Sequence, residues 1–107
     1  MTINGTEIYM TRGDNESITI TVNGQELLED DIAELTVRQT VRSEKVIHKT
    51  AKPNADMKSF TISIEPEDTH TLQFGNYIYD IQLTLSGAIR TVIRPSTFTI
   101  GEEVSYD

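Results

Sequence analysis

The chain has no cysteine among its 107 residues. Without thiols there can be no disulfide framework, no thiolate nucleophile and no cysteine-ligated zinc site. Small secreted domains of this size often carry disulfides, so their absence favours an intracellular or virion protein. Histidine is also scarce: only His48 and His70 occur, and neither lies in a metal-ligand spacing. We therefore expect no metal site built on these residue types.

Long apolar runs are missing as well. No segment reaches the roughly 20 apolar residues that a membrane span needs. The first ten residues, MTINGTEIYM, have no basic start, no continuous apolar stretch and no small-residue cleavage site. They do not match a signal peptide. We expect a protein that is made in the cytoplasm and does not bind a membrane.

Basic residues are outnumbered, with 9 Lys and Arg against 17 Asp and Glu and a net charge of −8. This balance argues against a nucleic-acid binder, which needs a basic face to neutralise phosphates. Six of the nine basic residues lie between positions 38 and 58. This segment is either a solvated hairpin or a basic edge that docks on an acidic surface of a neighbouring molecule. The candidate contact residues are Arg38, Arg42, Lys45 and Lys49.

What the sequence does contain is apolar and polar residues in strict alternation, which indicates half-buried strands. Strands are predicted over residues 6–11, 18–22, 33–39, 46–49, 60–64, 77–85, 88–94 and 97–100. Pro95 lies between the last two predicted strands and interrupts their pairing, and Ser86-Gly87 forms the hairpin turn between residues 77–85 and 88–94. Seven or so short strands without intervening helices predict an all-β, immunoglobulin-like antiparallel sandwich. We expect one domain over 1–107, with its core over about 6–100 and a tail over 101–107.

The most specific feature is the segment IEPEDTHTLQFGNYIYDIQ, from Ile64 to Gln82. Its proline and two acidic residues suit a first helical turn, so a short helical turn is predicted near 66–71. Immunoglobulin-like domains use a similar corner, in which a tyrosine bonds back to upstream backbone. Tyr77 is favoured over Tyr79 for this role because it lies closer to the corner. The predicted corner comprises Pro66, Asp68, Leu72, Gly75, Tyr77 and Tyr79.

Arg12-Gly13-Asp14 matches the tripeptide that integrin ligands display. Integrin recognition requires it at the tip of an exposed loop, whereas here it joins two predicted strands. Glycine and the following Asp-Asn pair are the residues that a tight connection needs, so we interpret the tripeptide as a turn.

Catalytic signatures are absent. No serine lies in a Gly-x-Ser-x-Gly context, and no glycine-rich phosphate loop is present. The run Glu29-Asp30-Asp31 offers carboxylates to a cation, but its spacing differs from that of a calcium loop, and we favour a solvated acidic loop. We expect a protein that is not an enzyme, carries no cofactor and binds no small molecule.

Three stretches together resemble a known family: MTRGDNESITITV, IAELTVRQ and ISIEPEDTHTLQFGNYIYDIQLTLSGAIRTVIRPSTFTI. They are similar to small structural proteins of phages and prophages of Gram-positive bacteria, and to the N-terminal immunoglobulin-like domain of the phage baseplate upper protein. The shared elements are the Arg-Gly-Asp turn, the Pro-Glu-Asp-Thr corner, the Gly-x-Tyr-x-Tyr-Asp-Ile strand and the Thr-Val-x-x-Pro-Ser-x-Phe ending. The sequence ends at Asp107, before the position of the linker and coiled coil that follow this domain in the baseplate protein, so we expect a small accessory or connector protein, or an excised domain.

The resemblance implies a structural module that is assembled into a virion in the tail or baseplate region. Its partners would be copies of itself or other particle proteins. It also implies local roles for the tripeptide: Gly13 for the backbone, Asp14 for capping the turn and Arg12 for a strand-edge ion pair.

Two other functions are compatible with a β-sandwich. A carbohydrate- or cell-surface-binding domain needs exposed aromatic residues, for which Tyr9, Phe74 and Tyr106 are the candidates. An acidic inhibitor that mimics DNA is compatible with the net charge, but the basic segment interrupts any continuous acidic stripe. Fold alone does not decide among these functions.

Overall fold

A computed structural model describes residues 2–102 as strands with one helical turn. The elements are β1 (Thr2–Asn4), β2 (Glu7–Thr11), β3 (Glu16–Thr21), β4 (Ile32–Arg38), β5 (Lys45–Ala51), β6 (Ser59–Ile64), α1 (Pro66–Thr69), β7 (Gly75–Leu85) and β8 (Ala88–Gly101). The predicted all-β class is confirmed, and the helical turn lies where the proline and acidic residues placed it.

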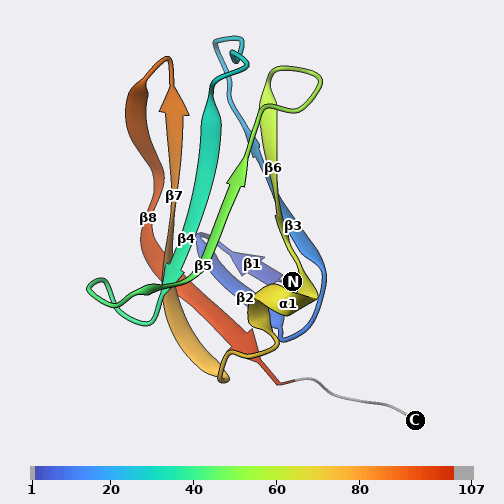
Figure 1. Ribbon diagram of the computed structural model, residues 1–107, viewed down its shortest axis with the longest axis vertical. Coiled ribbons are helices and arrows are strands. Elements are labelled where there is room, and N and C mark those ends of the chain that lie inside the picture. The colour runs from blue at the N-terminus through green and yellow to red at the C-terminus, as the bar shows by residue number, and fades with distance from the viewer. Residues whose placement is uncertain (1, 103–107) are drawn as a thin grey trace.

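The strands form two sheets of unequal size that pack face to face (Figure 1). The larger has six strands in the order β1-β2-β8-β7-β4-β5, and the smaller has only β3 and β6. Neighbouring strands are antiparallel, except that β2 runs parallel to β8 and pairs Ile8 with Phe98. The predicted sandwich is therefore confirmed, with one sheet much narrower than the other.

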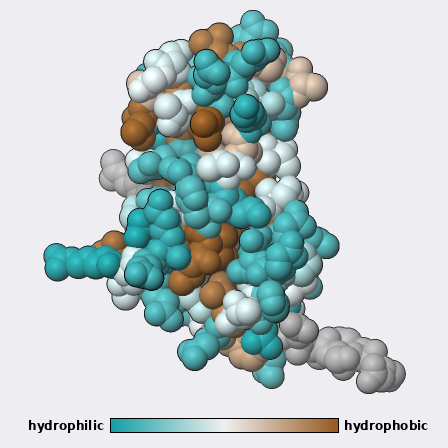
Figure 2. Space-filling view, in the orientation of Figure 1, coloured by the Kyte–Doolittle hydropathy of each residue, from teal (hydrophilic) through white to brown (hydrophobic). Residues whose placement is uncertain are grey.

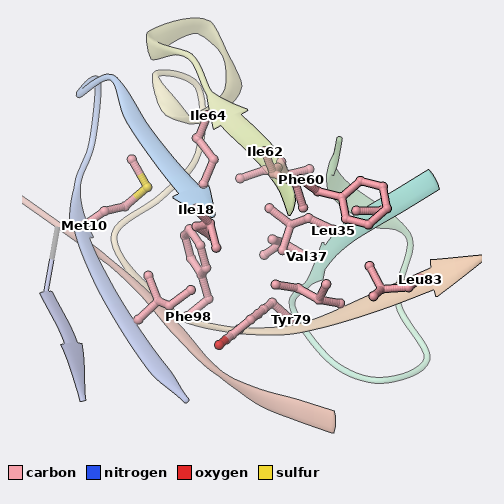
Figure 3. Packing of buried hydrophobic residues seen from close by; sticks show 14 of the residues in the cluster. Met10, Ile18, Leu35, Val37, Phe60, Ile62, Ile64, Tyr79, Leu83 and Phe98 are labelled. Atoms are coloured by element: carbon pink, nitrogen blue, oxygen red, sulfur yellow. The ribbon is translucent and has the colours of Figure 1, made fainter. Parts of the chain in front are cut away.

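The core lies between the sheets and follows the alternation of the sequence (Figure 3). Phe60, Ile62 and Ile64 of β6 face the inward side chains of the larger sheet. The rings of Tyr79 and Phe98 meet edge to face, with centroids 5.9 Å apart and planes at 72°. The fully buried large side chains include Met10, Leu27, Leu35, Val37, Phe60, Ile62, Ile64, Tyr79, Ile81, Phe98 and Ile100.

The predicted interruption at Pro95 is a bulge within one continuous strand, β8. Tyr79 pairs with Ser96 and Ile81 with Ile93, so two residues of β8 oppose one residue of β7. Proline fits there because a bulged residue is not required to donate a ladder hydrogen bond. The strand also extends to Gly101, which is buried, while residues 103–107 of the expected tail lie outside the described residues.

Two turns have the backbone that their sequences predict. Ser86 and Gly87 have φ of 52° and 82°, so both residues of the β7–β8 hairpin turn have positive φ, as a type I′ turn requires. Gly13 has φ of 87°, which a residue with a side chain adopts only under strain. The short strand β1 was not predicted from the sequence.

Candidate functional site

The corner between β6 and β7 is built around α1. The Glu65 N–H donates to Oδ2 of Asp68 at 2.7 Å, which satisfies one of the backbone donors that a helix start leaves open. The same carboxylate oxygen lies 3.1 Å from Nζ of Lys49. Leu72 is half-buried against the core, and Gly75 begins β7 with φ of 139°. These contacts show that Asp68, Leu72 and Gly75 have structural roles in the corner.

The two tyrosines of the corner bond to different parts of the backbone. The Tyr77 hydroxyl donates to the Gln73 carbonyl at 2.7 Å, which is the local bond of a tyrosine corner. The Tyr79 hydroxyl donates to the carbonyl of Thr6, which precedes β2. Burial raises the pKa of Tyr79 above its ordinary value. Both rings are buried, so neither is available to stack on a ligand.

The Arg-Gly-Asp turn is bonded to this corner. The Gly13 N–H donates to Oγ1 of Thr69 at 2.8 Å, and Thr69 is fully buried. The Arg12 N–H donates to the Gly101 carbonyl at 3.1 Å, and the Asp14 N–H to the Thr11 carbonyl at 3.2 Å. Because the backbone N–H of each of its three residues donates a hydrogen bond, the turn has a structural role. Thr69 is a contact of this turn that the sequence did not indicate.

The Arg12 side chain lies along the protein surface. Its guanidinium carbon is 4.2 Å from the centre of the Phe74 ring, within the range of a cation–π contact. Its Nη1 donates to the Leu72 carbonyl at 3.4 Å. An arginine engaged in this way does not extend from a loop tip, so the geometry does not support integrin recognition.

Among residues 2–102, the exposed aromatic residues do not form a platform for a sugar. Phe74 is 44% exposed, but Arg12 lies over its ring. Tyr9 is 51% exposed, and its ring lies against Gly101, where a Cβ atom would be 2.3 Å from the tyrosine hydroxyl. Tyr106 lies outside the described residues.

The basic segment is divided between two places. Arg38 ends β4, and its Nη1 donates to the Ser43 carbonyl at 2.6 Å, which braces the β4–β5 turn. Arg42 and Lys45 are exposed on that turn. Lys49 pairs with the buried Leu35, so its side chain starts on the inner face and reaches Asp68. Lys49 therefore does not belong to the exposed basic surface that the sequence suggested.

Beside the β4–β5 turn, the outer face of the larger sheet has a hollow of about 210 Å³. Val41 at its rim is 62% exposed. The lining residues are Thr36, Arg38, Val41, Ile78, Tyr79, Asp80 and Pro95. Figure 2 shows the turn projecting from the body as a hydrophilic arm at the left of the view. We use the name basic turn for residues 38–45 together with this hollow.

Asp31 has a structural role that the sequence did not reveal. The sequence predicts a solvated acidic loop over Glu29-Asp30-Asp31, but only Glu29 and Asp30 are exposed, whereas Asp31 is 2% exposed. Its Oδ2 accepts from the Leu28 N–H at 2.8 Å, and its Oδ1 accepts from the Ser86 N–H at 2.9 Å. The carboxylate therefore joins the β3–β4 loop to the β7–β8 hairpin.

The two histidines make local contacts. Nε2 of His48 lies 2.6 Å from Oε2 of Glu34 on the neighbouring strand, and Nδ1 of His70 lies 3.1 Å from the Glu67 carbonyl oxygen. Within residues 2–102, no three His, Asp or Glu side chains converge as metal ligands would. In the same range, no helix has the length and apolar character to cross a bilayer.

No family model matches the chain, and no curated protein matches it. The function therefore has to be inferred from the surfaces described above and from the sequence motifs.

Proposed function

We propose that this protein is a non-enzymatic structural module of a phage or prophage particle, placed in the tail or baseplate region, which acts as an adaptor through protein–protein contacts. The observation that carries the proposal is the basic turn. In a chain of net charge −8, Arg38 lines a hollow beside the exposed Val41, and Arg42 and Lys45 are exposed on the same turn. The motifs that resemble phage proteins supply the setting.

The chemistry of the basic turn defines the partner surface. Exposed cations attract an acidic patch and set its register, and a small apolar side chain fits the hollow beside Val41. Charges at the rim of an interface mainly affect the association rate and its salt dependence, while buried apolar contacts supply affinity. The partner is therefore an acidic protein surface with an apolar residue at its centre.

A first experiment locates the protein in the bacterium from which the gene derives. Particle production is induced, the particles are purified on a density gradient, and an antibody against this protein is used for immunoblotting and immunogold labelling. The protein is expected in the particle band, with label at the tail end. Protein found only in the fractions without particles would overturn the proposed function.

A second experiment tests the surface. The variant Arg42→Glu/Lys45→Glu reverses two exposed charges of the basic turn and leaves the bracing Arg38 in place. The matched control, Lys52→Glu/Lys58→Glu, changes the net charge equally at two other exposed lysines. Incorporation into particles is expected to fall at least tenfold for the first variant only. Equal incorporation of both variants would show that the basic turn makes no specific contact.

A further inference from the structure

The outer edge of β3 has no neighbouring strand among residues 2–102, because β3 pairs with β6 alone. The Val22 N–H donates to the Lys58 carbonyl at 2.8 Å, in register with the β3–β6 ladder. Hydrogen-bonded pairs alternate along an antiparallel ladder, so Ile18 and Ile20 direct their backbone groups to β6. The intervening residues direct theirs outward: Ser17, Thr19 and Thr21.

The outer edge of β6 is covered in part by residues 53–54, where the Asn54 N–H donates to the Ser59 carbonyl at 2.8 Å. The remaining open edges in the described chain carry features that discourage pairing. The edge strand β5 has two lysines, β1 has three residues, and β8 carries Arg90 and a bulge at Pro95. Charged residues, prolines, bulges and short lengths are the usual protections of sheet edges. The β3 sequence, ESITIT, has no lysine, arginine, proline or glycine. Glu16 at its start is its one charged residue, so the edge over residues 17–21 is open and unprotected.

A groove of about 340 Å³ lies beside the end of β3. Its apolar lining comes from Ile20 and Val22 on one side and from the β7–β8 hairpin on the other. Arg90 is the one charged residue in the lining, which otherwise consists of Ile20, Thr21, Val22, Asn23, Gln25, Leu83, Leu85 and Val92. An added strand would direct its inward side chains into this groove. The immunoglobulin arrangement has four strands in such a sheet, and the described residues provide two.

We infer that a second copy of the chain occupies this edge with its own β3, antiparallel, to give a continuous sheet in the order β6-β3-β3-β6 across a twofold axis. One register uses all three outward-facing residues. It places Thr19 opposite Thr19 and Ser17 opposite Thr21, which allows about six backbone hydrogen bonds. Shifts by two residues leave at least one of these residues without a partner.

The same register also matches the side chains. Ile18 lies opposite Ile20 on the inner face, and the outer face pairs threonine with threonine and serine with threonine, which are favourable cross-strand pairs. Glu16 of each copy lies opposite Val22 of the other, at the end of the groove that contains Arg90. The negative and positive charges therefore meet at each end, and this complementarity favours a second copy as the occupant.

Cysteine pairing tests the register, because the chain has no cysteine of its own. Opposite residues of an antiparallel pair have Cα atoms about 4.5–5.5 Å apart, within the range of a disulfide. Thr19→Cys is expected to form a disulfide-linked dimer under mild oxidation at least tenfold faster than Thr61→Cys, the control on β6. Ser17→Cys and Thr21→Cys should each remain unlinked alone, since their twofold mates lie about 13 Å away, but should link when mixed. Equal rates for all variants would overturn the inference.

Sedimentation equilibrium of the unmodified protein provides the second test. The mass is expected to rise from 12.0 kDa toward twice that value as the concentration increases. Thr19→Pro removes one outward N–H and leaves the bonds to β6 intact, so it should hold the protein at the monomer mass, whereas Thr19→Val should not. Circular dichroism confirms that the variants are folded. A wild-type monomer mass at millimolar concentration would overturn the inference while leaving the particle role untouched, because that role rests on the basic turn.

Discussion

Replacing Thr69 with valine tests whether the Arg-Gly-Asp turn is held by the corner. The two side chains have nearly the same volume, so the change removes the hydroxyl and little else. Oγ1 of Thr69 accepts from the Gly13 N–H at 2.8 Å, whereas its other contact, to the Pro66 carbonyl, is 3.5 Å long. The loss of stability in Thr69→Val is therefore expected to come mainly from the hydrogen bond to Gly13.

The magnitude follows from the donor that is left without a partner. Stranding a buried N–H costs about 1–3 kcal/mol. Gly13 is half-buried, so water replaces part of the lost bond, and the lower part of that range, about 1–2 kcal/mol, applies. For a domain of this size, each kcal/mol lowers Tm by about 4–8 °C.

The assay is urea unfolding followed by circular dichroism, with the amide exchange rate of Gly13 measured by NMR. Thr69→Val should lower the free energy of unfolding at an unchanged m value and speed the exchange of Gly13. Thr50→Val, at an exposed threonine of β5, should change stability by less than about 0.5 kcal/mol. If Thr69→Ser, which keeps the hydroxyl, destabilises the protein more than Thr69→Val, packing of the methyl group and not the hydrogen bond is responsible.

Three further predictions concern carboxylates and a tyrosine. Asp31→Ala leaves two backbone N–H groups without their acceptor and should cost about 2–4 kcal/mol in urea unfolding, against less than about 0.5 for the exposed Asp30→Ala. The pKa of Tyr79 is raised by burial, so the free energy of unfolding should fall as pH rises above about 10, and Tyr79→Phe should abolish that part of the decline. The pKa of Asp56 is lowered, first by the hydrogen bond from the Lys58 N–H, so its stabilisation is present above about pH 4 and lost below it. Acid unfolding of Asp56→Asn should show a correspondingly shallower pH dependence, and an unchanged profile would contradict this assignment.

The inward and outward faces of the strands could be predicted from the sequence. When one face of a sheet is buried, every second residue of a strand points to the core and is apolar. Leu35, Ile62 and Ile81 are inward and buried, as the alternation predicts. The same signal does not identify neighbouring strands, since any two strands with one apolar face can pair. The parallel pairing of β2 with β8 and the division into six strands and two therefore required the structure.

The roles of the polar residues were harder to predict from the sequence, because chemically identical side chains in one segment differ in their burial and contacts. Lys45 and Lys49 are four positions apart on β5, yet only Lys49 reaches across the sandwich to an aspartate. Asp30 and Asp31 are adjacent, and the second is buried because it accepts two backbone hydrogen bonds. One signal was present: Asp31 lies two positions before the strand predicted over 33–39, where an aspartate side chain often bonds to nearby backbone.

The parallel pairing of β2 with the end of β8 also sets the order of events during synthesis. Residues 8–11 of β2 find their partners at positions 98–101, so the ribosome makes β2 about 90 residues before this part of β8. At roughly 5–20 residues per second this delay lasts about 5–20 s. Both strands of the pairs β4–β5 and β3–β6 are synthesised well before then. β2 therefore cannot pair with β8 until residues 98–101 have been made, and until then the edge of β2 that carries Ile8 and Met10 is without this neighbour.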